Sequence, residues 1–121
     1  MGWKLKNYNL AIQMCFEGLI GNSFSLKVRE QTLLYVLDDV LIDWNKEELV
    51  FTFDLYKKDE DFGLYWKCKT GERVLFTLSH FKNYILEKHD LNHVRYIEIL
   101  QEDIYEYIAT VVKERFKLHI K

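Results

Sequence analysis

The sequence has no proline, and alanine occurs only at Ala11 and Ala109. Lysines greatly outnumber arginines, and isoleucine, asparagine, tyrosine and phenylalanine are frequent. Because proline, alanine, glycine and arginine have GC-rich codons, this composition predicts a gene from an AT-rich genome, with a phage or other mobile element as a fitting source. The observation concerns nucleotides and excludes no biochemical function.

Cysteine is nearly absent as well, since Cys15 and Cys68 are the only two. That number is too small for a disulfide scaffold, so we predict two reduced, half-buried strand residues. No apolar run approaches the roughly 20 residues of a membrane span. Residues 1–6 lack the apolar core of a signal peptide. We therefore expect a cytoplasmic protein that does not contact membranes.

Familiar catalytic motifs are also missing. The five glycines never take the spacing of a phosphate-binding or dinucleotide-binding loop, and no serine has the context of a nucleophile elbow. His89 and His93 have the spacing at which two imidazoles on one helix share a metal, but Asp90 and Asn92 are typical of a helix break between them. We predict no metal, no cofactor and no catalytic activity.

What the chain does contain is typical of one globular domain, residues 1–121. It is 49% hydrophobic and 30% charged, which excludes a disordered chain, and it shows no repeat or linker. The formal net charge of −2 argues against a uniformly basic nucleic-acid binder. Aromatic residues make up 16% of the chain, and we expect most of them to build the core.

Strands dominate the first two-thirds of the predicted structure. Tyr8–Glu17 alternates between apolar and polar residues and predicts a half-buried strand. In residues 24–44 a helix is possible, but the β-branched residues favour strands at 24–30 and 40–44, with 31–38 undecided. Residues 48–78 predict an antiparallel meander of three strands, with Thr70-Gly71 as its second turn.

The last third predicts two helices. Ser79 is a suitable N-cap for a helix that ends near His89. A longer helix begins either near Asn92 or at Gln101, in the latter case after a short strand at 94–99, and its last turn carries Lys113, Arg115 and Lys117. The fold class is therefore α+β, a mainly antiparallel sheet with one face covered by two C-terminal helices.

Charge is unevenly distributed along the chain. Between Glu17 and Asp61 acids outnumber bases by six, and the acids are densest around Trp44. An acidic surface with an aromatic centre suits a protein partner with a basic surface. We therefore predict a small non-catalytic interaction protein, a regulator, inhibitor or immunity-type factor. Its predicted contact residues are Asp38, Asp39, Asp43, Trp44, Glu47 and Glu48.

Two other functions stay open. A nucleotide or metabolite would fit a pocket between sheet and helices, with Tyr84 or Tyr107 in its wall and ligand contacts from Trp66, Lys67, Lys69, Arg73 and Tyr105. Alternatively, the basic strand face around Tyr65 would bind nucleic acid, which the net charge disfavours. Self-association through an exposed strand or the long helix is compatible with all of these functions.

Overall fold

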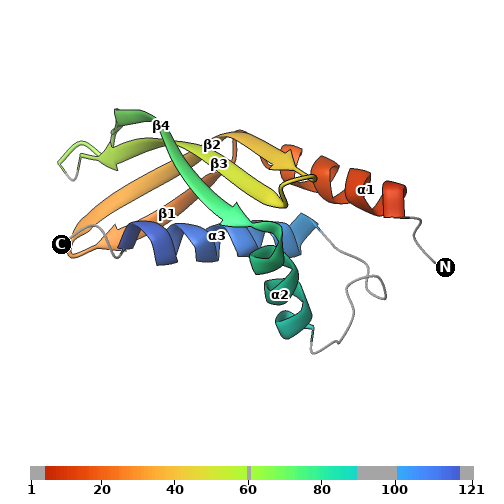
Figure 1. Cartoon of the computed structure of the whole chain (residues 1–121). Coiled ribbons are helices and arrows are strands. Elements are labelled where there is room, and N and C mark those ends of the chain that lie inside the picture. Colours follow the sequence, from red (N-terminus) through yellow and green to blue (C-terminus); the bar gives the residue numbers. More distant parts are fainter. Residues whose placement is uncertain (1–4, 60, 90–100, 118–121) are drawn as a thin grey trace.

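A computed structural model of the chain describes residues 5–59, 61–89 and 101–117. The elements in chain order are α1 (Leu5–Glu17), β1 (Ser23–Val28), β2 (Gln31–Asp43), β3 (Glu48–Lys58), β4 (Tyr65–Thr77), α2 (Leu78–Lys88) and α3 (Gln101–Lys117). The strands form one antiparallel sheet in the order β1-β2-β3-β4. Helices α2 and α3 lie on one side of the sheet, and α1 extends from one end of it (Figure 1), which confirms the predicted α+β class. None of the described helices is long and apolar enough to cross a membrane.

The predicted first strand is wrong, because residues Leu5–Glu17 form helix α1. Its alternating apolar residues are two series with a spacing of four, which also suits a helix. Ile12 and Phe16 belong to one series and are buried in the core, whereas Leu10 and Met14 belong to the other and are exposed. A spacing of four is a multiple of the strand period and nearly one helical turn, so alternation by itself could not separate the two structures.

Residues 31–38 belong to β2, so the helical alternative for 24–44 is wrong. A tight turn with Arg29 at φ 58° joins β1 to β2. The pairing of β2 with β3 shifts by one residue between Leu37 and Asp39. This bulge adds one residue to β2, which keeps both Leu37 and Val40 on the buried side of a long, bent strand.

The predicted turn at Thr70-Gly71 is also wrong, because β4 continues through it from Tyr65 to Thr77. Gly71 does adopt a positive φ of 72°. Instead of reversing the chain, it lies beside irregular pairing with β3, where the Asp54 carboxylate accepts its N–H at 3.1 Å. Glycine serves bulges and turns by the same conformational freedom, so the residue type does not decide between them. The predicted meander thus has two strands, β3 and β4.

The C-terminal helices follow the predicted pattern with one change of cap. The side chain of Thr77, rather than Ser79, accepts the N–H of His80 (3.1 Å) and caps α2. Helix α3 spans Gln101–Lys117 in the described part of the chain, and the other predicted start, near Asn92, lies outside it. The predicted strand at 94–99 lies outside the described residues.

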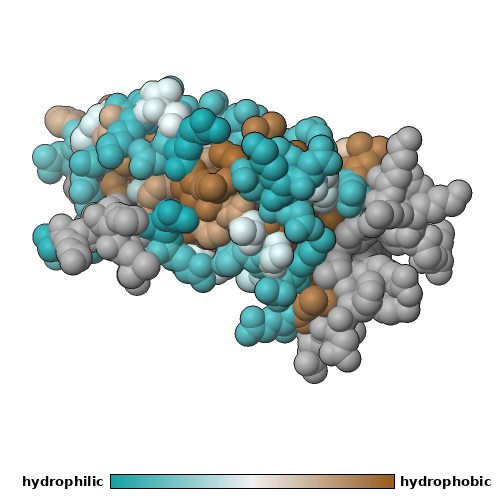
Figure 2. Space-filling model, in the orientation of Figure 1, coloured by the Kyte–Doolittle hydropathy of each residue, from teal (hydrophilic) through white to brown (hydrophobic). Residues whose placement is uncertain are grey.

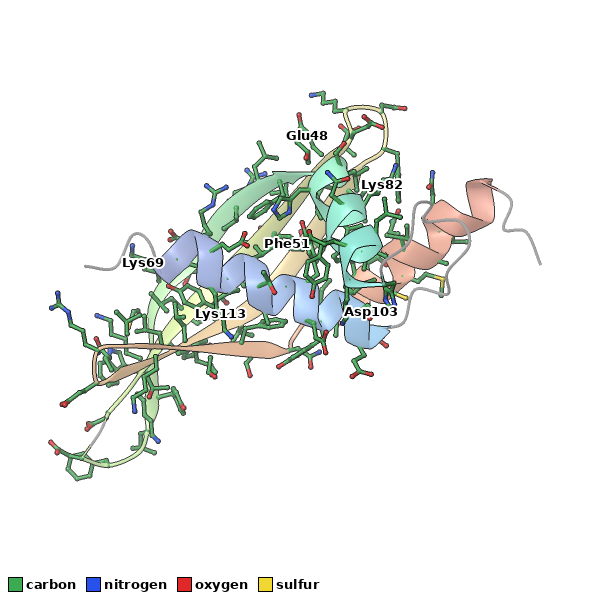
Figure 3. All side chains as sticks on the ribbon, turned by 90° about the horizontal axis from the view of Figure 1, so that it is seen from below. Glu48, Phe51, Lys69, Lys82, Asp103 and Lys113 are labelled. Carbon is green, nitrogen blue, oxygen red and sulfur yellow. The ribbon has the colours of Figure 1, made fainter. Side chains whose placement is uncertain are left out.

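An aromatic core joins the helices to the covered face of the sheet. Phe16 of α1 contacts Phe51 of β3 and Tyr107 of α3, with ring centroids 5.8 Å and 6.4 Å away. Tyr35 of β2 stacks on Phe116 of α3 at 4.1 Å. Phe51 lies between the sheet and the helices (Figure 3). Since aromatic rings bury large apolar areas, this cluster contributes strongly to the stability of the fold.

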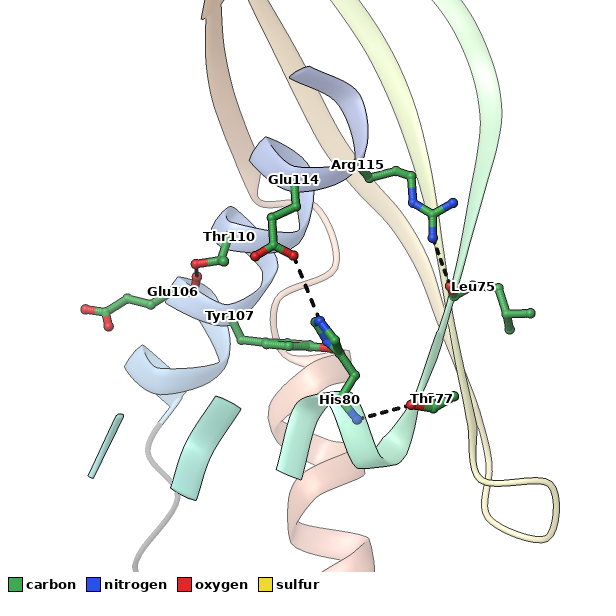
Figure 4. A network of polar contacts seen from close by, with 8 residues as sticks. All are labelled: Leu75, Thr77, His80, Glu106, Tyr107, Thr110, Glu114 and Arg115. Carbon is green, nitrogen blue, oxygen red and sulfur yellow. Dashed lines mark hydrogen bonds and ion pairs between the residues drawn. The ribbon is translucent and has the colours of Figure 1, made fainter. Parts of the chain in front are cut away.

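Helix α3 also reaches both edges of the sheet. The Tyr105 hydroxyl donates to the backbone carbonyl of Ser23 in β1 (3.2 Å), and the Arg115 guanidinium donates to the carbonyl of Leu75 in β4 (3.3 Å; Figure 4). Unpaired backbone groups on an edge strand attract other strands. These two side chains therefore satisfy one carbonyl on each edge as well as holding the helix in place.

Candidate functional site at the β3–β4 hairpin tip

The turn between β3 and β4 is built around Asp59. The Asp59 N–H donates to the carbonyl of Leu64 (2.6 Å), and the Asp59 carbonyl accepts the N–H of Gly63 (2.7 Å). Its carboxylate accepts the N–H groups of Asp61 (2.9 Å) and Phe62 (3.4 Å). Gly63 adopts a φ of 69°, a conformation that glycine reaches without strain. The hydrogen bonds give the turn a defined shape, which lowers the entropy lost when a partner binds.

This turn displays large apolar side chains to solvent. The exposed fractions are 77% for Phe62, 68% for Leu64, 44% for Tyr65 and 48% for Trp66. We call Asp59 and residues 61–66 the hairpin tip. It projects from the end of the sheet opposite α1 (Figure 1). Exposed apolar residues grouped in this way mark binding surfaces more often than single exposed residues do.

Lysines flank the hairpin tip in a regular pattern. Lys57 pairs across the strands with Trp66, Lys58 with Tyr65, and Lys67 with Tyr56. The Lys67 ammonium lies 5.7 Å from the centre of the Tyr56 ring and 3.6 Å from the Asp54 carboxylate. Interaction with Tyr56, and then with Asp54, raises the pKa of Lys67 above its ordinary value. Cross-strand pairs of this kind favour the hairpin, and the Lys67–Tyr56 contact is a cation–π interaction.

The net charge around the hairpin tip does not suit a polyanion. Lys69 lies 4.0 Å from Glu72, Lys67 has Asp54 as its partner, and the tip itself carries Asp59 and Asp61. Lys69 pairs with Leu55, whose side chain is buried in the core, and lies on the other face of β4 from Arg73. The predicted basic strand face therefore divides between two faces, and Lys67 and Lys69 each have an acidic partner.

The predicted acidic surface is only partly gathered in space. Asp39, Asp43 and Glu48 share the face of the sheet that the helices leave uncovered, as the pairing of Asp43 with Glu48 and of Asp39 with Thr52 indicates. The Asp43 carboxylate already accepts the N–H groups of Asn45 and Lys46, each at 3.0 Å. Asp38 is exposed at the β2 bulge. Glu47 is exposed in the next turn, where its carbonyl accepts the N–H of Leu78.

Trp44, the predicted aromatic centre of that surface, packs against the core. It is half-buried, and its indole N–H donates to the Gln13 side chain of α1 at 3.3 Å. Among the described residues, three of the four large exposed aromatic side chains, Phe62, Tyr65 and Trp66, lie instead at the hairpin tip, and the fourth is Tyr105 on α3. The charged run at residues 57–61 is typical of a solvated loop, and the predicted site residues did not include Phe62 or Leu64. The usable signal was two apolar residues, Phe62 and Leu64, directly after that charged run.

The residues predicted for a small-ligand pocket lie far apart. Trp66 belongs to the hairpin tip, whereas Tyr105 lies on the Phe24 ring of β1 (4.7 Å between centroids). Tyr107 is fully buried, and Tyr84 packs against it. Figure 1 shows the hairpin tip and α2 in different parts of the molecule. The structure does not bring this predicted set together.

Histidine and cysteine do not form a metal site in the described part of the chain. His89 lies at the end of α2, with Nε2 3.2 Å from the Asp103 carboxylate, and its predicted companion His93 lies outside the described residues. Each cysteine meets only part of the prediction of a half-buried strand residue, since Cys15 is half-buried but helical and Cys68 lies in a strand but is exposed. Cys15 lies in α1, where burial raises the pKa of its thiol, and Cys68 is exposed in β4.

Comparison with known proteins adds no assignment: the chain matches no family model, and neither a curated protein nor a solved structure matches it significantly.

Proposed function

We propose that this chain is a non-catalytic protein-binding domain, a regulator, inhibitor or immunity-type factor, and that its hairpin tip inserts Phe62 and Leu64 into an apolar pocket of the partner. The observation that carries the proposal is the grouping of four exposed apolar residues on a turn with a defined shape. Aromatic residues that enter a pocket dominate the binding energy of many interfaces. Asp61 beside Phe62 favours a pocket with a basic rim.

The experiment compares two double variants with matched exposure. Phe62→Ser/Leu64→Ser changes the hairpin tip, and Leu10→Ser/Met14→Ser changes two residues of α1 that are 57% and 62% exposed. A protein captured by the wild-type chain from the lysate of an AT-rich bacterium is purified, and each chain is titrated with it. The tip variant should bind at least about 30-fold more weakly, as hot-spot residues do, while the α1 variant binds like the wild type.

Equal binding by the tip variant would contradict the proposal. So would a captured complex that nuclease treatment dissolves, since that result would favour the nucleic-acid alternative. Both variants must keep the wild-type circular dichroism spectrum, which is expected because the four side chains are exposed.

The predicted acidic surface is a second candidate contact surface. Titration with the same partner tests whether it contributes to binding. Charge reversal at Asp38, Asp39 and Asp43 should weaken binding and reduce its dependence on salt if that surface contributes. Binding through the hairpin tip depends mainly on apolar contact and should change little with ionic strength. A salt-independent affinity that survives the charge reversal would assign the partner to the hairpin tip alone.

A further inference from the structure

The described helices leave one face of the sheet uncovered, and that face has a regular arrangement of side chains. Leu41, Val50 and Leu75 are paired across β2, β3 and β4 and form one row. Their neighbours Val40, Phe51 and Val74 are buried under the helices, and side chains alternate along a strand, so this row points away from the helices. Leu41 is 58% exposed and Leu75 is 54% exposed. We call this surface, with the rows on either side, the open face.

The neighbouring row carries opposite charges at its two ends. Asp39 on β2 and Arg73 on β4 both flank Thr52 on β3. The two charges lie two strand spacings apart, about 10 Å, and no ion pair joins Arg73 to any described residue. The Asp39 carboxylate contacts only the backbone, where it accepts the N–H of Val40 at 2.9 Å. The row is thus an acid and a base held apart on a flat, partly apolar surface.

We propose that the open face binds a second copy of this chain around a twofold axis parallel to β3. Such an axis exchanges the β2 side with the β4 side of the facing sheet. Leu41 of each copy then meets Leu75 of the other, and Asp39 of each copy meets Arg73 of the other. A twofold axis makes each contact twice, so a short apolar row and one charge pair become a self-complementary interface.

The charges also select this orientation over its alternative. An axis in the sheet plane but perpendicular to β3 would place Asp39 against Asp43 of the second copy, an acid against an acid. It would leave Arg73 against Thr77. Because like charges in an interface are costly, the parallel axis is favoured.

The parallel axis has a consequence for the hairpin tips. It leaves direction along β3 unchanged, so both tips lie at the same end of the dimer. The dimer would then present two hairpin tips to one surface. The dimer interface itself is separate from the hairpin tip and does not rest on the function proposed for the tip.

Sedimentation velocity across micromolar to submillimolar concentrations tests the dimer. The wild type should shift from monomer to dimer as its concentration rises. Leu41→Glu should remain monomeric, whereas Leu10→Glu on α1, with nearly the same exposure in the wild type, should dimerise normally. Arg73→Asp should weaken the dimer at least about tenfold, and the double exchange Asp39→Arg/Arg73→Asp should restore it, since the pair is then reversed.

Disulfide trapping tests the axis. In a Cys15→Ser/Cys68→Ser background, Leu41→Cys/Leu75→Cys should give a cross-linked dimer on mild oxidation. Within one chain these positions are two strands apart, beyond the reach of a disulfide. Either substitution alone should cross-link poorly. A monomer at every concentration would overturn the proposal and leave the open face to a different protein. Dimerisation of Leu41→Glu, or equal cross-linking by a single substitution, would overturn it too.

Discussion

The hydroxyl of Tyr107 lies 2.8 Å from Nδ1 of His80, beneath the sheet where α2 crosses α3. The other imidazole nitrogen lies 3.9 Å from the Glu114 carboxylate (Figure 4). Tyr107 is fully buried and contacts rings from α1, α2 and β3, including Phe16, Phe81 and Phe51. The contact therefore joins the two C-terminal helices at the centre of the core.

Loss of this hydrogen bond should lower the stability measurably. In Tyr107→Phe the ring still fills its place, so we expect the free energy of unfolding to fall by about 1 kcal/mol. Tyr105→Phe is the control, because its hydroxyl is at the surface and its loss should cost less. Urea denaturation measures both variants, and equal effects would contradict the central role of the Tyr107 contact.

Alkaline pH should destabilise the fold through Tyr35. Burial, and secondarily Glu72, raises the pKa of Tyr35 to about 12, whereas an unfolded tyrosine titrates near 10. The folded state then binds more protons than the unfolded state between these values, so stability is complete below about pH 10 and is lost as the pH rises towards 12. The loss is on the order of 2 kcal/mol. In Tyr35→Phe the dependence of the urea midpoint on pH should be flatter in this range, and an unchanged slope would exclude Tyr35 as its origin.

The shape of the hairpin tip should depend on the side chain of Asp59. In Asp59→Ala the N–H groups of Asp61 and Phe62 lose their acceptor, so their hydrogen exchange should become faster while exchange in the core stays the same. Asp59→Asn keeps one acceptor oxygen and should have a smaller effect. Amide exchange followed by NMR measures this, and unchanged protection in Asp59→Ala would show that backbone contacts alone hold the turn.

Loss of the buried Asp103 carboxylate should lower the stability more than loss of the exposed Glu106 carboxylate, although both pair with Lys88. Asp103 is buried at the start of α3, with one carboxylate oxygen 3.0 Å from the Lys88 ammonium and the other 3.2 Å from His89. Lys88 also pairs with Glu106, which is exposed. Asp103→Ala should cost about 1–3 kcal/mol, because it removes charged hydrogen bonds between α2 and α3. Glu106→Ala should cost well under 1 kcal/mol. Thermal unfolding compares the two, and similar losses would contradict this ranking.

The sheet could be predicted where only one face of a strand is buried. β3 alternates from Leu49 to Leu55 because its odd positions enter the core, and no helix has that period. Alternation gave the wrong prediction at α1, because the apolar residues there repeat every four positions. That spacing suits both a strand and a helix. It also failed at Gly71, where local sequence shows that the backbone needs freedom but not which irregular structure uses it.

Exposure was harder to predict than secondary structure. Trp44 and Trp66 are both large aromatic residues near charged neighbours, and nothing local distinguishes them. Trp44 is half-buried because α1 packs over it, and Trp66 is exposed because the hairpin extends past the helices. Figure 2 shows that hydrophobic residues reach the surface in the middle of one side of the molecule, where hydrophilic residues surround them.

Composition and periodicity by themselves determined the α+β class, the β3 strand, the two C-terminal helices and the predominantly aromatic core, because these follow from which residues must leave water. Only the tertiary structure decided which surfaces stay open. Whether Leu41, Phe62 or Leu75 is buried depends on which other element reaches it. The helices gather on one face of the sheet, so the other face and the hairpin tip remain in solvent, where a partner or a second copy would bind.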